Sequence, residues 1–341
     1  MAAMQEEFDA LLRNRTLQLV PRPRHANVVH GFRQRAGIDF TGTFAPVVKP
    51  DTIHTVLHLA GSRAWPVHQM DVSSTFLHGH LEEQVFCQQP TGFVDLALLD
   101  HVCLLSRSLY GLKQALRAWY QRIAAFLHQL GFRSTRSDAS LFIYHQGSDT
   151  AYLILYVVRH PDGFFLHQRK YAHELLECAD MLNCKPATML VDTKAKLSST
   201  DGSPASDAAF YQSIIGALQY HTLTRSEIQY AMQHVCLHMH APRDVHWAAI
   251  KRILRYICGT MDLGVTLHAS ADTTLTAYSY ADWAGGPDTR RSTSGYCVYL
   301  GPSLISWSSK REPTVSRSSA EAEYRAVANT ISECSWLRQL L

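Results

Sequence analysis

The spacing of apolar side chains predicts several amphipathic helices along the chain. Apolar residues recur three and four positions apart, which is the periodicity of a helix with one buried face. The stretches with this spacing are residues 4–19, 115–130, 245–257 and 321–341. The two central stretches are followed by Gly131 and Gly259, typical helix stops because glycine adopts left-handed backbone readily. The first stretch is ended by the string PRPRH.

The helix expected at the end of the chain also has a start signal. Ser318 and Glu321 have the spacing of a capping box, in which the serine hydroxyl accepts from the backbone of the glutamate. The residues expected on the buried face of this helix are Tyr324, Val327, Ile331, Cys334 and Leu337.

Strand signals alternate with these helices. Residues 44–93 show short apolar runs separated by turns, with room for one short helix. Two strands are expected at 140–144 and 151–158, around the turn QGSD, and further strands at 274–306. The Ser-, Gly-, Pro- and Asp-rich string KLSSTDGSPASD, residues 196–207, is the best candidate for a linker.

Composition excludes a few broad classes. With 46% hydrophobic and 18% charged residues the chain is expected to be globular, and a net charge of +3 fits nucleic-acid binding no better than an ordinary surface. The eight cysteines form no CxxC pair and no secretory signal is found, so free thiols and an intracellular, cytoplasmic or nuclear location are expected. No apolar run suggests a membrane partner. His234, His238 and His240 lack a third ligand with zinc spacing and are interpreted as surface or packing residues.

Two strings contain residue types suited to nucleotide chemistry. In WPVHQMDVSSTFLHG, Asp71 ends a strand-like run, where a carboxylate could bind a divalent metal but could equally be a turn residue. In SLYGLKQALRAWY, Gly111 gives a tight backbone before a helix. Lys113 and Arg117, four positions apart, could contact phosphates or form a solvated basic face.

Taken together, five strings in this order resemble the reverse transcriptase of copia-type LTR retrotransposons. They are RQRAGIDFTGTFAPVVK, QMDVSSTFLHGHLEEQVFCQQPTGF, SLYGLKQALRAWY, SIIGALQYHTLTRSEIQYA and DTRRSTSGYCVYLG with the following SWSSK and SRSSAEAEYRA. The resemblance covers nearly the whole chain. It implies an α+β fold in which a reverse-transcriptase palm and fingers remnant precedes a partial RNase H-like α/β unit. The implied domains are residues 1–195, a linker and helical connection at 196–265, and the RNase H-like part at 266–341.

The resemblance also implies roles for single residues. Asp71 matches the first metal-binding aspartate of the polymerase, and Phe76 matches a bulky position that disfavours a 2′-hydroxyl. The 109–119 segment matches the part that handles template and incoming base, which assigns binding roles to Gly111, Lys113, Gln114 and Arg117. Glu323 matches a metal-binding glutamate of RNase H, and Asp282 is a nearby acid that could be a further metal ligand. Asp71 and Glu323 are the implied catalytic remnants. Mg²⁺, an RNA template and an RNA–DNA hybrid are the implied cofactor and partners.

Three departures from the family pattern oppose activity. The strand LILYV at 153–157 is followed by Val-Arg-His-Pro instead of an aspartate pair, and the next several dozen residues are missing. A basic finger hairpin is missing between Val29 and His30. Tyr280 replaces an RNase H aspartate, although Asp282 lies two positions on, and the family strand with a further aspartate is not reached.

The sequence therefore predicts a reverse transcriptase and RNase H by descent that is internally deleted, C-terminally truncated and catalytically inactive. The alternatives are a non-catalytic remnant that binds nucleic acid, through residues such as Lys113, Arg117 and Arg290 with Arg291, or a gene-model fragment without function. The two junctions fit real deletions or coding sequence skipped as introns.

Overall fold

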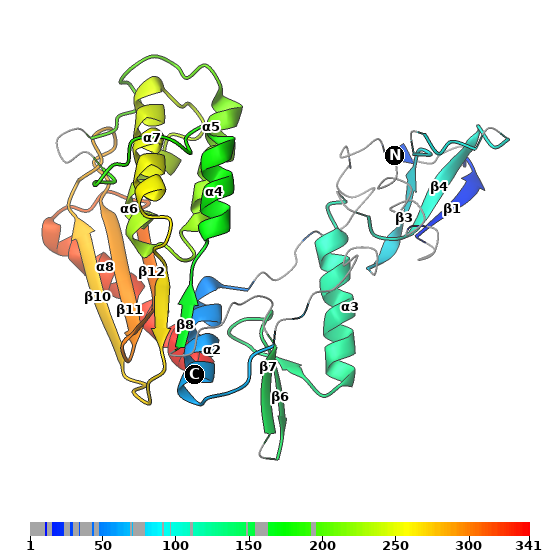
Figure 1. The fold of residues 1–341 in the computed structure, drawn as a ribbon, viewed down its shortest axis with the longest axis horizontal. Coiled ribbons are helices and arrows are strands. Elements are labelled where there is room, and N and C mark those ends of the chain that lie inside the picture. Colours follow the sequence, from blue (N-terminus) through cyan, green and yellow to red (C-terminus); the bar gives the residue numbers. More distant parts are fainter. Residues whose placement is uncertain are drawn as a thin grey trace. The chain divides into compact units, whose positions relative to one another are not determined.

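Figure 1 shows the fold of the chain as a computed structural model. The structure describes residues 11, 16–23, 28–29, 34, 43, 48–68, 70, 79–90, 92–95, 97–109, 112–147, 149–153, 163–191 and 196–341. Its contacts divide the chain into two compact units. Unit 1 comprises Met1–Val48 and Met70–Leu155, and unit 2 comprises Lys49–Gln69 and Tyr156–Leu341.

Unit 1 contains a four-stranded sheet. The order is β1 (Leu17–Pro21), β4 (His101–Arg107), β3 (His80–Cys87) and β2 (Val28–Val29). β1 and β3 pair antiparallel with β4, whereas β2 pairs parallel with β3. Val85 and Leu105 are buried at the centre of this sheet and form a small core with apolar neighbours.

The described part of unit 1 also contains a helix and a small antiparallel sheet. They are α3 (Ala115–Gln129), β5 (Arg133–Ser134), β6 (Phe142–Gln146) and β7 (Asp149–Leu153). The predicted helix and the predicted strands around QGSD are confirmed within the described residues. The Phe132 N–H donates to the Leu127 carbonyl at 3.0 Å, and Gly131 has a φ of +93°, which is the glycine-terminated helix end expected from the sequence.

The prediction of a helix as far as residue 19 is wrong at its end. Of residues 4–15 the structure describes Leu11, which is helical, but Leu17–Pro21 forms β1. The partly buried Leu17 and Leu19 flank the exposed Gln18, a two-residue alternation that a helical count overlooks. Pairing with β4 then satisfies the backbone hydrogen bonds.

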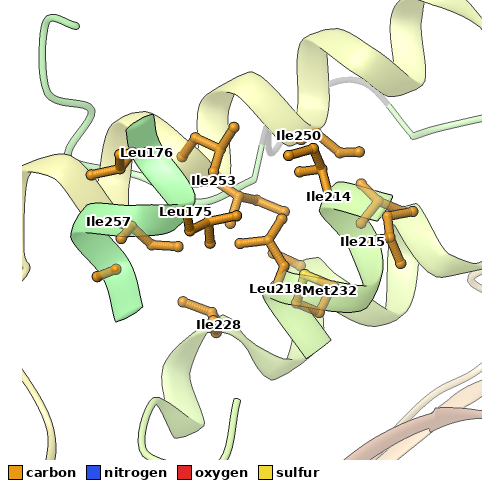
Figure 2. Close-up of a cluster of buried hydrophobic side chains, with 14 of the residues drawn as sticks. Leu175, Leu176, Ile214, Ile215, Leu218, Ile228, Met232, Ile250, Ile253 and Ile257 are labelled. Atoms are coloured by element: carbon orange, nitrogen blue, oxygen red, sulfur yellow. The ribbon is translucent and has the colours of Figure 1, made fainter. Parts of the chain in front are cut away.

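The helical part of unit 2 surrounds one continuous apolar core. It consists of α4 (Arg169–Cys178), α5 (Ala208–His221), the 3-10 helix η2 (Ser226–Ile228), α6 (Gln229–Cys236) and α7 (Asp244–Gly259). Figure 2 shows Leu175, Ile214 and Ile253 from three of these helices directed toward one another. The helix predicted at 245–257 is confirmed as α7, with Ile250, Ile253, Leu254 and Ile257 buried.

The sheet part of unit 2 follows in sequence. β10 (Leu275–Asp282), β11 (Thr293–Leu300) and β12 (Ser303–Arg311) form an antiparallel sheet in that order, followed by α8 (Ser319–Leu340). A second core joins this sheet to α2 (Pro50–Ser62) and to the antiparallel pair β8 (Gly163–Leu166) and β9 (Val265–His268). The mixture of helix and sheet in both units agrees with the predicted α+β class.

The predicted buried face of α8 is wrong over its first half. Tyr324, Val327 and Ile331 are 73%, 40% and 60% exposed. Instead Ala322 and Ala326 pack against Ala281 of β10. Small side chains let the helix approach the sheet closely, but they give a weak signal in a periodicity count next to larger apolar residues. Leu337, further along, is buried as predicted.

The expected linker at 196–207 has no helix or strand, but it is tied to the rest of unit 2. The Ser198 hydroxyl donates to Asp288 at 2.5 Å, the Ser199 N–H donates to the same carboxylate at 2.7 Å, and Pro204 forms a bridge with Arg243. The domain boundaries at 195 and 265 stay a prediction.

The start of α8 gives a first testable prediction. The Ser318 hydroxyl accepts from the Glu321 N–H at 3.2 Å, while Glu321 accepts from Arg317 N–H at 2.7 Å rather than from Ser318 itself. Ser318→Ala should lower the free energy of unfolding by about 1 kcal/mol, because an N-terminal amide loses its acceptor. The control is Ser332→Ala at an exposed position within α8, where alanine should not destabilise. Equal losses in denaturant titrations of the two variants would contradict the capping role.

Candidate functional site

Two buried amides hold the turn before α3, which the sequence assigned to template binding. Gln34 donates from Nε2 to Oε1 of Gln114 at 2.9 Å, and the Lys113 N–H donates to Oε1 of Gln34 at 2.7 Å. Gln34 and Gln114 are 8% and 3% exposed. Gln114 therefore has a structural task in this turn in addition to any contact with nucleic acid.

Lys113 and Arg117 do not share a helix face as expected. α3 begins at Ala115, so Lys113 lies in the preceding turn, where its side chain is exposed. Arg117 is half-buried in a small hollow that also includes His80 and Glu83 of β3. α3 begins where the sequence predicted, so the spacing of four does not align the two cations, because Lys113 lies before the helix that contains Arg117.

α3 packs closely against Gly79, the residue immediately before β3. A Cβ on Gly79 would lie 2.9 Å from Ala118 Cβ and 2.6 Å from Ser108 Oγ. The Ser108 N–H also donates to the Gly79 carbonyl at 2.9 Å, and Arg122 hydrogen-bonds with His80 at 3.0 Å. The position after QMDVSSTFLH therefore tolerates only glycine at this contact.

Asp71, Phe76 and Gly111 lie outside the described residues. Their roles as first metal ligand, bulky nucleotide contact and tight backbone position stay predictions.

In unit 2 the candidate metal residue Asp282 lies at the end of β10. It accepts a hydrogen bond from the Thr293 N–H, and the chain at Gly285 bends closely over its carboxylate. Lys196 donates to the Gly285 carbonyl at 3.1 Å. A cavity of about 480 Å³ between this strand end, α6 and α7 includes Asp282, Lys196 and Arg252 in its lining.

The charges around Asp282 act on two residues of α6. Burial raises the pKa of Tyr230, the Asp282 carboxylate raises it further, and the positive charge of Arg311 opposes them. Burial lowers the pKa of His234, Arg311 lowers it as well, and Asp282 acts in the opposite direction. Asp282, Tyr230 and His234 line the same cavity, so the Asp282 carboxylate lies on the side of the sheet next to α6.

Glu323 belongs to the helix on the other side of the sheet. It is exposed in the first turns of α8, which packs through Ala322 and Ala326 on Ala281. Because neighbouring strand residues point to opposite faces, Asp282 points away from the face that α8 covers. In the described part of the chain no group of three or more His, Cys, Asp or Glu residues could hold a metal ion. Asp282 and Glu323 therefore do not face a common metal site, and a role of each in binding Mg²⁺ stays a prediction.

The histidines singled out in the sequence have different surroundings. His238 is buried and stacks on His246, with ring centroids 3.8 Å apart. His234 is half-buried beside Asp282, and His240 is exposed. All eight cysteines are free, as expected.

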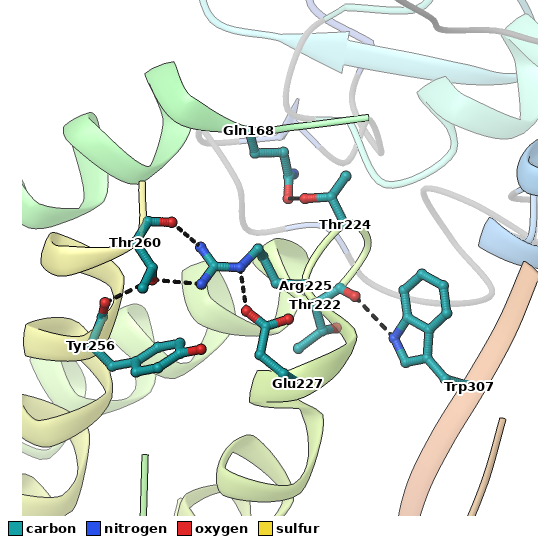
Figure 3. Close-up of polar contacts among 8 residues, drawn as sticks. All are labelled: Gln168, Thr222, Thr224, Arg225, Glu227, Tyr256, Thr260 and Trp307. Carbon is teal, nitrogen blue, oxygen red and sulfur yellow. Dashed lines mark hydrogen bonds and ion pairs between the residues drawn. The ribbon is translucent and has the colours of Figure 1, made fainter. Parts of the chain in front are cut away.

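Sequence reasoning missed Arg225, a fully buried cation in the segment Thr222–Glu227, which we call the TLTRSE segment. Figure 3 shows the Arg225 guanidinium between Glu227, at 2.5 Å, and Thr260, whose carbonyl and hydroxyl accept at 2.9 and 2.7 Å. The same segment accepts from the Trp307 indole at 3.2 Å through the Thr222 carbonyl. The only available signal was its position inside one of the family-like strings.

Comparison with known families defines the class of protein. A model described as reverse transcriptase (RNA-dependent DNA polymerase) matches residues 14–162. Residues 14–162 belong to this family, as the motifs predicted.

Similarity extends over nearly the whole chain to Pol polyproteins of copia-type retrotransposons. It is 38% identical to the retrovirus-related Pol polyprotein from transposon RE2 of Arabidopsis thaliana, over 99% of this chain and 28% of that protein. It is 32% identical to the one from transposon TNT 1-94 of Nicotiana tabacum, over 100% of this chain and 31% of that protein. An uncharacterized mitochondrial protein of Arabidopsis thaliana is 46% identical over 54% of this chain and 77% of its own length.

The chain thus spans less than a third of the two Pol polyproteins. Among its described residues no helix is long and apolar enough to cross a membrane.

Proposed function

We propose that this chain is the reverse transcriptase and RNase H region of a retrotransposon Pol polyprotein that no longer polymerises DNA. The observation that carries the proposal is the missing aspartate pair after the strand 153–157. Two metal ions must be held in line for phosphoryl transfer, and Asp71 alone cannot hold both. Loss of the pair removes the metal contribution to the rate.

The length of the alignments supports internal loss of sequence. The match to the RE2 polyprotein runs over 405 residues and the match to the TNT 1-94 polyprotein over 417, both more than the 341 residues of this chain. The relatives therefore contain residues without a counterpart here, as expected if segments are missing at 29/30 and 158/159. Genomic DNA across these junctions distinguishes deletions from skipped coding sequence.

The RNase H-like assignment of residues 266–341 belongs to the same proposal. Three antiparallel strands followed by one helix fit the opening of that fold, and β10 carries Tyr280 and Asp282 on one face. Asp282 and Glu323 lie on different sides of β10, and Asp282 already accepts from Thr293. This arrangement supports loss of hybrid cleavage as well, because two separated carboxylates bind a divalent ion poorly.

An RNA template and an RNA–DNA hybrid are the partners that this proposal implies. The second candidate function, non-catalytic binding of nucleic acid, is favoured by the exposed Lys113 and by the exposed pair Arg290 and Arg291. Binding of nucleic acid through these cations does not require the missing aspartate pair.

Primer extension tests the proposal directly. The purified chain, given primed RNA, deoxynucleotides and Mg²⁺ or Mn²⁺, should yield no extended primer, whereas an active reverse transcriptase on the same template should. Any primer extension by the chain should be compared with primer extension by the Asp71→Asn variant. Product that disappears in this variant would show a working metal site and overturn the inactive assignment.

A further inference from the structure

A groove lined by aromatic rings runs along the face of the β10–β11–β12 sheet opposite α8. Its volume is about 430 Å³. Tyr278 and Tyr280 of β10 form one side, and Tyr230 of α6 forms the other. The three rings are 61%, 61% and 41% exposed, so their faces are accessible from solvent.

The strand register explains why this part of the sheet is hollow. Tyr280 pairs with Gly295, which pairs with Ser309, so a residue without a side chain and a small one form the floor beside the tyrosine. The next row on this face joins Tyr278, Cys297 and Trp307. Trp307 also lines the groove. Same-face residues on a strand are about 6.6 Å apart, about twice the ~3.4 Å rise between stacked bases, so a planar group has room between adjacent rings.

We propose that this groove binds the bases of single-stranded nucleic acid by stacking them on Tyr280, Tyr278 and Tyr230. Aromatic side chains on an open sheet are a recurrent base-binding surface, because every base offers a flat π-face. This inference deepens the second candidate function by giving it a site and a strand preference.

The charges around the groove favour nucleic acid over an apolar protein partner. The end of the sheet next to Tyr280 carries three arginines, which are Arg311 on β12 and the exposed Arg290 and Arg291 in the turn between β10 and β11. One carboxylate, Asp282, lies on the same face in the row of Arg311 and accepts from the Thr293 N–H. The one acidic side chain among the described lining residues, Glu227, is paired with Arg225 at 2.5 Å. Cations at one end of neutral rings suit phosphates that follow a line of stacked bases.

The same geometry favours single strands over a hybrid duplex. Bases in a duplex are stacked on each other and offer only their edges in the grooves. The faces of Tyr278 and Tyr280 can meet bases only where a strand is unpaired. Single-stranded substrate should therefore bind more tightly than an RNA–DNA hybrid of equal length.

Fluorescence anisotropy with a labelled oligouridine and with a matched RNA–DNA hybrid tests the proposal on the full chain. Tyr280→Ala should weaken oligouridine binding about ten-fold or more, whereas Tyr280→Phe, which keeps the ring, should bind like the parent chain. The matched control is Tyr324→Ala, which removes a tyrosine 73% exposed on α8. Circular dichroism verifies that the variants fold alike.

Three outcomes would overturn the proposal. One is equal binding by Tyr280→Ala and Tyr324→Ala. Another is tighter binding of the hybrid than of the single strand. The third is self-association of the chain that disappears with Tyr280→Ala in sedimentation runs without nucleic acid, because the groove would then bind a second copy. None of these outcomes depends on primer extension, so failure here and failure of the proposed loss of polymerisation are distinguishable.

Discussion

Arg225→Met should lower the free energy of unfolding of unit 2 by about 3 kcal/mol, the largest effect expected from a single substitution outside the apolar core. The Arg225 side chain is 1% exposed and donates to Glu227, to the Thr260 carbonyl and to the Thr260 hydroxyl. Removing the guanidinium leaves these acceptors without their donor in a dry site, and an unsatisfied buried group costs free energy. Glu227 is 36% exposed, so water reduces part of this loss.

The loss of stability caused by Arg225→Met should affect several elements, because the segment around Arg225 contacts all of them. The TLTRSE segment joins α7 through Thr260, the start of α4 through a hydrogen bond of 2.9 Å between Thr224 and Gln168, and β12 through Trp307. Figure 3 shows that these partners belong to separate elements. Weakening this segment should therefore loosen both the helical core and its attachment to the sheet.

Arg169→Met is the matched control for this prediction. Arg169 also forms an ion pair in unit 2, with Asp262 at 2.9 Å, but the two side chains are 64% and 76% exposed. Such a pair contributes about 0–1 kcal/mol. Arg225→Lys should give an intermediate loss, since an ammonium group cannot reproduce the fork of donors. Denaturant unfolding in which Arg225→Met and Arg169→Met are equally mild would contradict the structural role of Arg225.

The sequence predicted the elements with strong periodicity. α3 and α7 were placed within two residues of their bounds, because large apolar side chains recur on one face and glycine lies at or just after the end of each helix. The family was also predictable, because five ordered strings carry it. Prediction failed at α8, where alanines rather than Tyr324 and Ile331 face the sheet, and at β1, where a short alternation was counted as helix.

The candidate site was less predictable than the fold. Residue type and motif order assigned Asp282 and Glu323 to one metal region, but the face on which each lies depends on which side of β10 is covered by α8. The groove beside Tyr280 requires the register that places Gly295 and Ser309 next to it, and the approach of Tyr230 from α6. Such contacts between distant positions have no signature in a single sequence.

Acid should destabilise unit 2 through buried histidines, of which His221 is the clearest. Its side chain is 1% exposed and neither ring nitrogen has a hydrogen-bond partner. Burial, assisted by the charge of Arg225, lowers the pKa of His221 from 6.5 to about 4. Burial and the stacked His246 lower the pKa of His238 to about 4 as well.

The direction in which stability changes with pH depends on whether the folded or the unfolded chain binds the proton more readily. Between pH 6.5 and 4 the unfolded chain protonates His221 while the folded chain does not, so stability is present above pH 6.5 and is lost as pH falls toward 4. Asp51 acts in the opposite direction. Burial and the nearby Glu333 raise the pKa of Asp51 from 3.8 to about 7, so its contribution is present below pH 3.8 and is lost as pH rises toward 7.

The variant His221→Leu separates the contribution of His221 to the pH dependence of stability from that of Asp51. At neutral pH the variant should be at least as stable as the parent chain, since it removes two unsatisfied ring nitrogens from the core. At pH 5 its advantage should grow by about 2 kcal/mol, because the parent alone loses stability to protonation of the unfolded chain. Asp51→Asn should show the reverse, with its advantage greatest near pH 7. The control is His173→Leu, which changes an exposed side chain of α4. If the stability advantage of His221→Leu were the same at both pH values, His221 would not be a neutral imidazole in the folded chain.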